Sequence, residues 1–210
     1  MIARLPWFAM DAITAYLAGL LFSFSLVIAI GAQNAYVLRQ GARRVHVKTV
    51  IGICAASDVL LIAAGVGGMG AVVRSDPSLL TVIRVLGGAL LLAYAALSAR
   101  RAFKQLERRR DPEDGHSRRR VIAATLGFTW LNPAVYIDTL VLLGSVASSH
   151  PASRWWFGAG AATASIVWFI ALGGAAQLLA PILRRPASAR LLELFVAVVM
   201  TATALRTLPL

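Results

Sequence analysis

Two carboxylic acids stand inside otherwise apolar stretches of this 210-residue sequence. Asp58 lies within a run from about Thr49 to Val73, and Asp138 lies five residues beyond Pro133 in a run within 121–149. If these runs cross a lipid bilayer, an ionised carboxylate near the centre costs roughly 2.5 to 3.5 kcal/mol even on a lenient insertion scale. We therefore expect each carboxylate to face other helices or water, and both are candidates for binding a cation or a proton.

Side-chain amides accompany helix-disturbing residues in two of the apolar runs. Gln33 and Asn34 follow Gly31 near the end of one run, and Asn132 precedes Pro133 in another. Proline removes a backbone donor and frees carbonyl groups, which lipid tolerates only where they face protein or water. Paired interruptions in corresponding spans are typical of a transporter's substrate site. The alternative is a packed proline kink, with asparagine forming a hydrogen bond between helices.

The acidic residues also have a structural interpretation. Arg84, in a neighbouring apolar run, is an available partner for either Asp58 or Asp138. Glu193 lies nearer the membrane interface and one turn from Arg190, so we expect these two residues to form an i, i+3 pair on the surface.

The composition excludes a soluble globular enzyme, because 59% of the residues are apolar, 14% are charged and the mean hydropathy is +0.74. Six runs are long enough to cross a bilayer as helices. We predict an all-α integral membrane protein with six transmembrane helices, at residues 12–38, about 49–73, 77–99, within 121–149, 155 to about 180, and about 191–208.

The basic residues are distributed unevenly between the loops. Lysine and arginine number 21 against 9 acidic residues, and 16 of them fall in the loops after the first, third and fifth runs against 4 on the opposite side. The positive-inside rule therefore predicts that the 16-residue side is cytoplasmic and that both termini lie outside. The basic stretch 100–120 is interpreted as a cytoplasmic loop that attracts anionic lipid, rather than as a nucleic-acid site.

That basic stretch divides the chain into two halves with three spans each. An odd number of spans in the first half makes the second half enter the membrane from the opposite face. We therefore predict two inverted three-helix repeats, residues 1–99 and 121–210, joined by the linker 100–120.

The sequence lacks the residues that several kinds of functional site require. The single cysteine, Cys54, excludes an intramolecular disulfide and a CxxC site, and the three histidines lie at the ends of runs or in loops. No metal and no cofactor are therefore expected, and serine protease chemistry of the rhomboid type fails because no histidine lies within a span.

Two classes of function remain. In a carrier, Asp58 or Asp138 meets a cationic group while amide and backbone donors at the breaks hold an anionic one. In an intramembrane aspartyl protease, Asp58 and Asp138 would share a proton, but no Gly-x-Gly-Asp motif is present. A simple channel would not require paired titratable groups.

Strings of residues along nearly the whole chain resemble the LysE family of basic amino-acid exporters. They are Gly31-Ala32-Gln33-Asn34-Ala35-Tyr36-Val37-Leu38-Arg39-Gln40-Gly41, Ser57-Asp58-Val59-Leu60, Thr129-Trp130-Leu131-Asn132-Pro133-Ala134-Val135-Tyr136-Ile137-Asp138, Arg154-Trp155-Trp156-Phe157, Ala164-Ser165-Ile166-Val167-Trp168-Phe169 and Val196-Ala197-Val198-Val199-Met200. The family has Gly-Pro-Gln-Asn where this chain has Ala32 after Gly31, so Gly31 is the only local helix breaker.

The resemblance implies export of L-lysine or L-arginine from the cytoplasm by exchange with protons. Moving a cation outward against the membrane potential costs about 2.3 kcal/mol per charge per 100 mV, so export needs coupling, and a titratable aspartate can supply it. The expected partners are a cationic amino acid, protons, anionic lipid at the cytoplasmic face and a second copy of the chain. The residues expected to bind substrate are Gln33, Asn34, Asp58, Asn132, Pro133, Tyr136 and Asp138.

Overall fold

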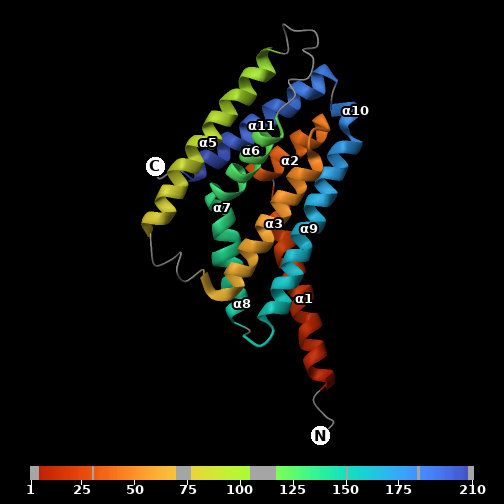
Figure 1. Cartoon of the computed structure of the whole chain (residues 1–210), viewed down its shortest axis with the longest axis vertical. Coiled ribbons are helices and arrows are strands. Elements are labelled where there is room, and N and C mark those ends of the chain that lie inside the picture. Colours follow the sequence, from red (N-terminus) through yellow and green to blue (C-terminus); the bar gives the residue numbers. More distant parts are fainter. Residues whose placement is uncertain are drawn as a thin grey trace. The chain divides into compact units, whose positions relative to one another are not determined.

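A computed structural model describes residues 5–29, 31–69, 77–104, 117–149, 151–183 and 185–207, and every regular element in those ranges is a helix (Figure 1). The all-α prediction is confirmed. Four segments are long and apolar enough to cross a membrane, at Val47–Met69, Arg84–Phe103, Arg154–Leu178 and Pro186–Arg206. Two further pairs of helices, each separated by a short break, raise the number of candidate spans to six if each pair forms one span.

Both broken spans are at the places where the sequence carries its amides and helix breakers. The first predicted span consists of α1 (Leu5–Val27) and α2 (Ala32–Arg43). The fourth consists of α6 (Arg118–Trp130), α7 (Pro133–Tyr136), the π-helical turn η2 (Ile137–Leu143) and α8 (Gly144–Ser148).

The remaining helices correspond to the other four predicted spans. They are α3 (Val47–Ala64) with the π-helical turn η1 (Gly65–Met69), α5 (Pro77–Lys104), α9 (Arg154–Leu178), α10 (Ala180–Leu183) and α11 (Pro186–Thr207). Since α5 continues to Lys104 and α6 begins at Arg118, the ends of the predicted loop 100–120 are helical. Its centre, 105–116, and most of the predicted turn at 74–77 lie outside the described residues.

The chain forms two compact units, and each contains segments from distant parts of the sequence. The first unit comprises Met1–Ala29, Ala55–Leu80 and Ala134–Trp168, and the second comprises Ile30–Cys54, Thr81–Pro133 and Phe169–Leu210. The chain crosses between the units at five places, and two of them, at residues 29–30 and 133–134, lie at the two helix breaks. These units differ from the two inverted repeats, 1–99 and 121–210, whose arrangement stays a prediction.

Close backbone approach organises the first unit, in which η1 packs against η2 and α8. A side chain at Gly65 would overlap the carbonyl oxygen of Thr139, so only glycine allows this contact. In the same unit, Ile62, Leu143 and Phe157 belong to one buried apolar cluster. In lipid, such small-residue contacts supply the van der Waals packing that holds helices together.

The second unit is built around α2, which packs against α6, α10 and α11 (Figure 1). Ten of the twelve residues of α2 are buried, although its sequence, AQNAYVLRQGAR, is polar. A helix of this composition gains little from apolar burial, because its polar groups lose water when they enter the protein. Polar contacts within the unit must therefore hold α2 in place.

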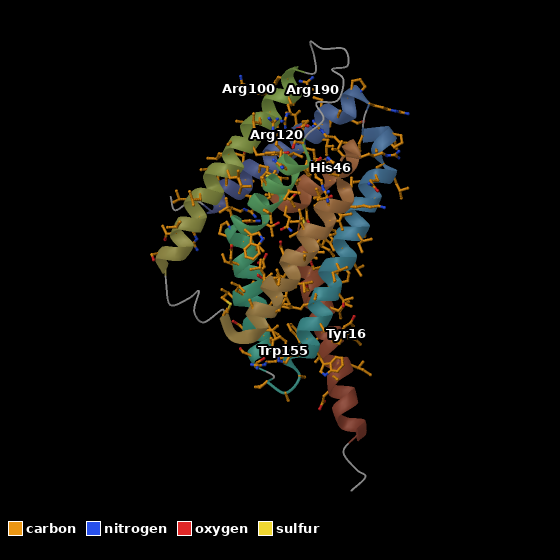
Figure 2. All side chains as sticks on the ribbon, viewed as in Figure 1. Tyr16, His46, Arg100, Arg120, Trp155 and Arg190 are labelled. Atoms are coloured by element: carbon orange, nitrogen blue, oxygen red, sulfur yellow. The ribbon has the colours of Figure 1, made fainter. Side chains whose placement is uncertain are left out.

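Large apolar side chains point outward along the long helices, as in Leu60 of α3, Ile170 of α9 and Val198 of α11, each more than half exposed. A soluble protein rarely exposes so much apolar surface, whereas a lipid bilayer favours it. Trp155, at the start of α9, is exposed and lies at the same end of the first unit as Tyr16 (Figure 2). Aromatic residues at one end are typical of the membrane interface.

Candidate functional site

The first break lies at Gly31, immediately before α2. The backbone of Gly31 is extended, with φ −100° and ψ −174°, and a side chain there would meet nothing within 4 Å. The conformational freedom of glycine is therefore not what breaks this span, and the break is present although the chain has Ala32 in place of the proline. Gln33 and Asn34 occupy the first turn of α2, and both are buried.

The second break lies between α6 and α7. The last turn of α6 closes with a hydrogen bond from the Leu131 amide to the Gly127 carbonyl at 3.0 Å, and Pro133 begins the next helix, where its missing donor costs nothing. A side chain at Gly87 of α5 would overlap the carbonyl oxygen of Leu131. Thus α5 approaches the broken backbone directly, and Asn132 is buried at the break.

Within the second unit, the two breaks lie at the same end of their helices. The rings of Tyr36 in α2 and Phe128 in α6 are in contact, with centroids 4.8 Å apart. His46, just after α2, and Arg120, at the start of α6, lie at one end of the unit (Figure 2), so the helices run antiparallel. From the Tyr36–Phe128 contact, α2 leads back to Asn34 and α6 leads on to Asn132, both away from that end. Asn34 and Asn132 therefore both lie on the side of this ring contact away from His46 and Arg120.

In the first unit, Asp58 is buried in α3 and is hydrogen-bonded to α9. The hydroxyl of Ser165 donates to Asp58 Oδ2 at 2.6 Å. A charge-assisted bond of this kind is shorter and about twice as strong as a neutral hydrogen bond. The expectation that this carboxylate faces other helices is thus confirmed.

Asp138 and Tyr136 lie beside the segment that carries Asp58. Leu61 of α3 and Leu140 of η2 pack together, and Tyr136 packs against them. Asp58 is three residues before Leu61, and Asp138 is two residues before Leu140. Asp138 is half-buried in a π-helical turn, a distortion that occurs frequently at functional sites.

The whole-chain similarity to known proteins agrees with these features. Residues 24–209 match the model of the family described as LysE type translocator. The chain belongs to the LysE family. An arginine exporter protein, ArgO, of Serratia proteamaculans is 40% identical to this LysE-family chain over 193 residues, which cover 91% of the chain and 94% of ArgO.

A second group of relatives is mycobacterial. A Mycobacterium tuberculosis protein named "Putative amino-acid transporter Rv0488" is 43% identical over 180 residues, covering 86% of the LysE-family chain and 90% of the relative. No solved structure matches the chain. The family and the apolar helices identify a multi-pass membrane protein of amino-acid transport, and they favour a carrier over the aspartyl protease.

One sequence prediction for this LysE-family protein is wrong. Glu193 does not form a surface pair with Arg190: it is 3% exposed, and its Oε1 atom lies 2.8 Å from Arg39 Nε and 3.0 Å from Arg43 Nη2. The positions of Glu193 in α11 and of both arginines in α2 explain the difference, because these two helices pack together. Arg39 lies just beyond the predicted span 12–38, yet it is inside α2 and almost fully buried.

Two polar residues outside the predicted set belong to these contacts. Ser165 binds Asp58, and Tyr94 of α5 accepts a hydrogen bond from Arg39 Nη1. The sequence signal for Ser165 is a hydroxyl group within an apolar span. Within the described ranges, no three His, Cys, Asp or Glu side chains gather closely enough to hold a metal ion.

Proposed function

We propose that this protein exports L-arginine and L-lysine from the cytoplasm in exchange for protons. The observation that carries the proposal is the buried carboxylate of Asp58, held by Ser165 within an apolar helix and followed on a packed neighbouring segment by Asp138. Carboxylates at this depth are expensive unless they serve a cation or a proton. The relative named as an arginine exporter favours a substrate with a cationic side chain.

One of the two carboxylates couples substrate and proton in the proposed cycle. Asp58 or Asp138 pairs with the cationic side chain of the substrate when ionised, and takes a proton from outside after the substrate has left. Exchange of one cation for another lets the proton gradient supply the work of moving a charge outward, about 2.3 kcal/mol per 100 mV. Tyr136, packed beside both segments, offers a hydroxyl to the same substrate end.

The amides at the helix breaks suit the other end of an amino acid. Gln33 Nε2 is buried and has no hydrogen-bond partner among the described residues, so its donor is available to a carboxylate. Asn34 and Asn132 add buried amide groups beside the two breaks, and Pro133 keeps the second break open. Backbone donors at a helix N-terminus also favour a negative charge.

The proposed setting is the inner membrane, with both termini outside and the basic linker 100–120 against anionic lipid in the cytoplasm. In the second unit, Arg100, Arg120 and Arg190 come from three different helices and lie at one end (Figure 2), which supports a single cytoplasmic face for that unit. Two inverted three-helix repeats, 1–99 and 121–210, and a second copy of the chain complete the proposal.

Efflux from intact cells tests the proposal. Cells with and without the protein are loaded with dipeptides containing labelled arginine or lysine, and the free amino acid appearing outside is measured. We expect faster appearance with the protein present, and loss of this difference when the proton gradient is dissipated. Equal efflux from both cell types would contradict transport of basic amino acids. Efflux that does not change when the proton gradient is dissipated would contradict exchange with protons.

A further inference from the structure

A buried charged cluster lies in the second unit, apart from the residues assigned above. The guanidinium of Arg39 is almost fully buried, donates to Glu193 and Tyr94, and lies 5.4 Å from the centroid of the Tyr94 ring. Arg39 Nη2 is also buried and has no hydrogen-bond partner in the described part of the chain. A buried donor in this state has lost water without gaining a replacement.

Positive charge exceeds negative charge in this cluster. Arg43 also binds Glu193, and Arg101 of α5 acts electrostatically on Arg43. Glu193 is the only carboxylate among the described residues of the second unit, so three arginines face one acid. Buried charge without a counter-charge is costly, which points to an anion that is bound here during function.

We propose that the Arg39–Arg43–Glu193 cluster binds the α-carboxylate of the amino-acid substrate as it enters from the cytoplasm. This inference rests on the proposed function, since it gives the exported amino acid a first binding site. The cluster lies at the C-terminal end of α2, on the side of His46, where the basic residues of this unit gather (Figure 2). The proposed cytoplasmic end and the entry site therefore coincide.

The geometry favours a small planar carboxylate over a lipid headgroup. Guanidinium donors lie in one plane and match the two oxygens of a carboxylate. The side chain of Arg43 is 34% exposed and that of Arg39 is 1% exposed, so the cluster meets the outside through Arg43, and a group that binds the buried Arg39 Nη2 must be small enough to enter the protein. A bulky headgroup would reach the rim but not Arg39 Nη2.

One helix connects this cluster with the break. Arg39 follows Gln33 by six residues in α2, about 9 Å at 1.5 Å per residue. Gln33 Nε2 and Arg39 Nη2 are both buried donors without a partner among the described residues. The same helix therefore carries an unpartnered donor at each of these two positions, one in the cluster and one beside the break.

Uptake into inside-out membrane vesicles tests this site, because such vesicles present the cytoplasmic face to the medium. Labelled L-arginine uptake is inhibited with unlabelled L-arginine, with agmatine, which is arginine without its carboxylate, and with inorganic phosphate. The variants are Arg39→Gln and Arg43→Gln. The matched control is Arg44→Gln, since Arg44 is exposed and donates only to the Gln177 carbonyl in the described structure.

We expect Arg39→Gln to raise the inhibition constant of arginine about 10-fold and to change that of agmatine by less than about 2-fold, because only arginine carries the carboxylate. Arg43→Gln should act in the same direction, and Arg44→Gln should change neither constant. If Arg39→Gln is absent from the membrane, Arg43→Gln decides, since that side chain is partly exposed and its loss leaves the buried Arg39–Glu193 pair intact.

Three results would overturn the entry site. An equal rise for arginine and agmatine would mean that the arginines only position α2, and unchanged constants would mean that they do not meet the substrate. Inhibition by phosphate as strong as that by arginine would indicate a general anion site. Vesicles of the unmodified protein that take up no arginine would instead contradict the proposed function itself.

Discussion

The hydroxyl of Ser165 in α9 lies 2.6 Å from Asp58 Oδ2 in α3, so two helices of the first unit share a hydrogen bond to a buried carboxylate. A hydrogen bond to a charged group is worth about 1.5–3 kcal/mol. Replacing Ser165 with alanine removes the donor without adding volume. We expect Ser165→Ala to slow arginine efflux about 10-fold at unchanged membrane abundance.

The control for this change lies on the same helix. Thr163 donates to the carbonyl of Ala159, one turn back in α9, at 2.9 Å. Thr163→Ala removes a hydroxyl that serves only this local bond among the contacts described, and efflux should stay within about 2-fold of the unmodified rate. Equal losses in both variants would mean that the hydroxyl of Ser165 has no specific role.

The sequence predicted the helices and the two breaks well, because both follow from local signals. Long apolar runs report membrane helices directly, and Pro133 interrupts a helix for covalent reasons. The first break was also foreseen from the amides after Gly31, although the glycine itself is not required there. The burial of Asp58 followed from the cost of exposing a carboxylate to lipid.

Contacts between distant segments could not be predicted from one sequence. Arg190 is three residues from Glu193 and was the obvious local partner, whereas the observed partner, Arg39, is 154 positions away. Only the packing of α2 against α11 brings them together. Ser165 was missed for the same reason, since its partner lies 107 positions away on another helix.

The approach of α5 to the second break predicts a strict requirement for glycine at position 87. A side chain at Gly87 would overlap the Leu131 carbonyl oxygen, and relieving such an overlap costs about 1–3 kcal/mol and shifts the backbone. Gly87→Ala should therefore lower the melting temperature of the purified protein and reduce efflux. Gly52→Ala is the control, because a side chain there meets nothing within 4 Å; a Gly87→Ala protein as stable and active as this control would refute the close approach.

The Arg39–Glu193 pair predicts a non-additive pair of substitutions. Glu193→Leu alone leaves Arg39 buried without its carboxylate, which is expected to cost about 3–5 kcal/mol. The double variant Arg39→Leu with Glu193→Leu removes both charges and should recover most of that loss. Thermal unfolding of the purified protein measures the three stabilities, and purely additive effects would show that the two side chains do not interact.

The charge distribution predicts the orientation of the chain. Arg4→Cys, Arg110→Cys and Leu210→Cys are made singly in a Cys54→Ala background, where the buried native thiol is absent. An impermeant thiol reagent applied to intact cells should label positions 4 and 210 but not position 110. Labelling only of position 110 would reverse the topology and, with it, the cytoplasmic location of the entry site.

Efflux of arginine as a function of external pH, in Asp58→Asn and Asp138→Asn variants, tests the central claim most directly. Asparagine keeps the size and hydrogen bonding of aspartate but carries neither a negative charge nor a titratable proton. In the unmodified protein, export should increase as external pH falls, because protons enter in exchange. At least one Asn variant should abolish export, the matching Glu variant should retain part of it, and Arg84→Gln should keep the pH dependence. If both Asn variants export at the unmodified rate with unchanged pH dependence, the carboxylates do not couple transport to protons, and a structural role, such as the Ser165–Asp58 hydrogen bond, becomes the better account.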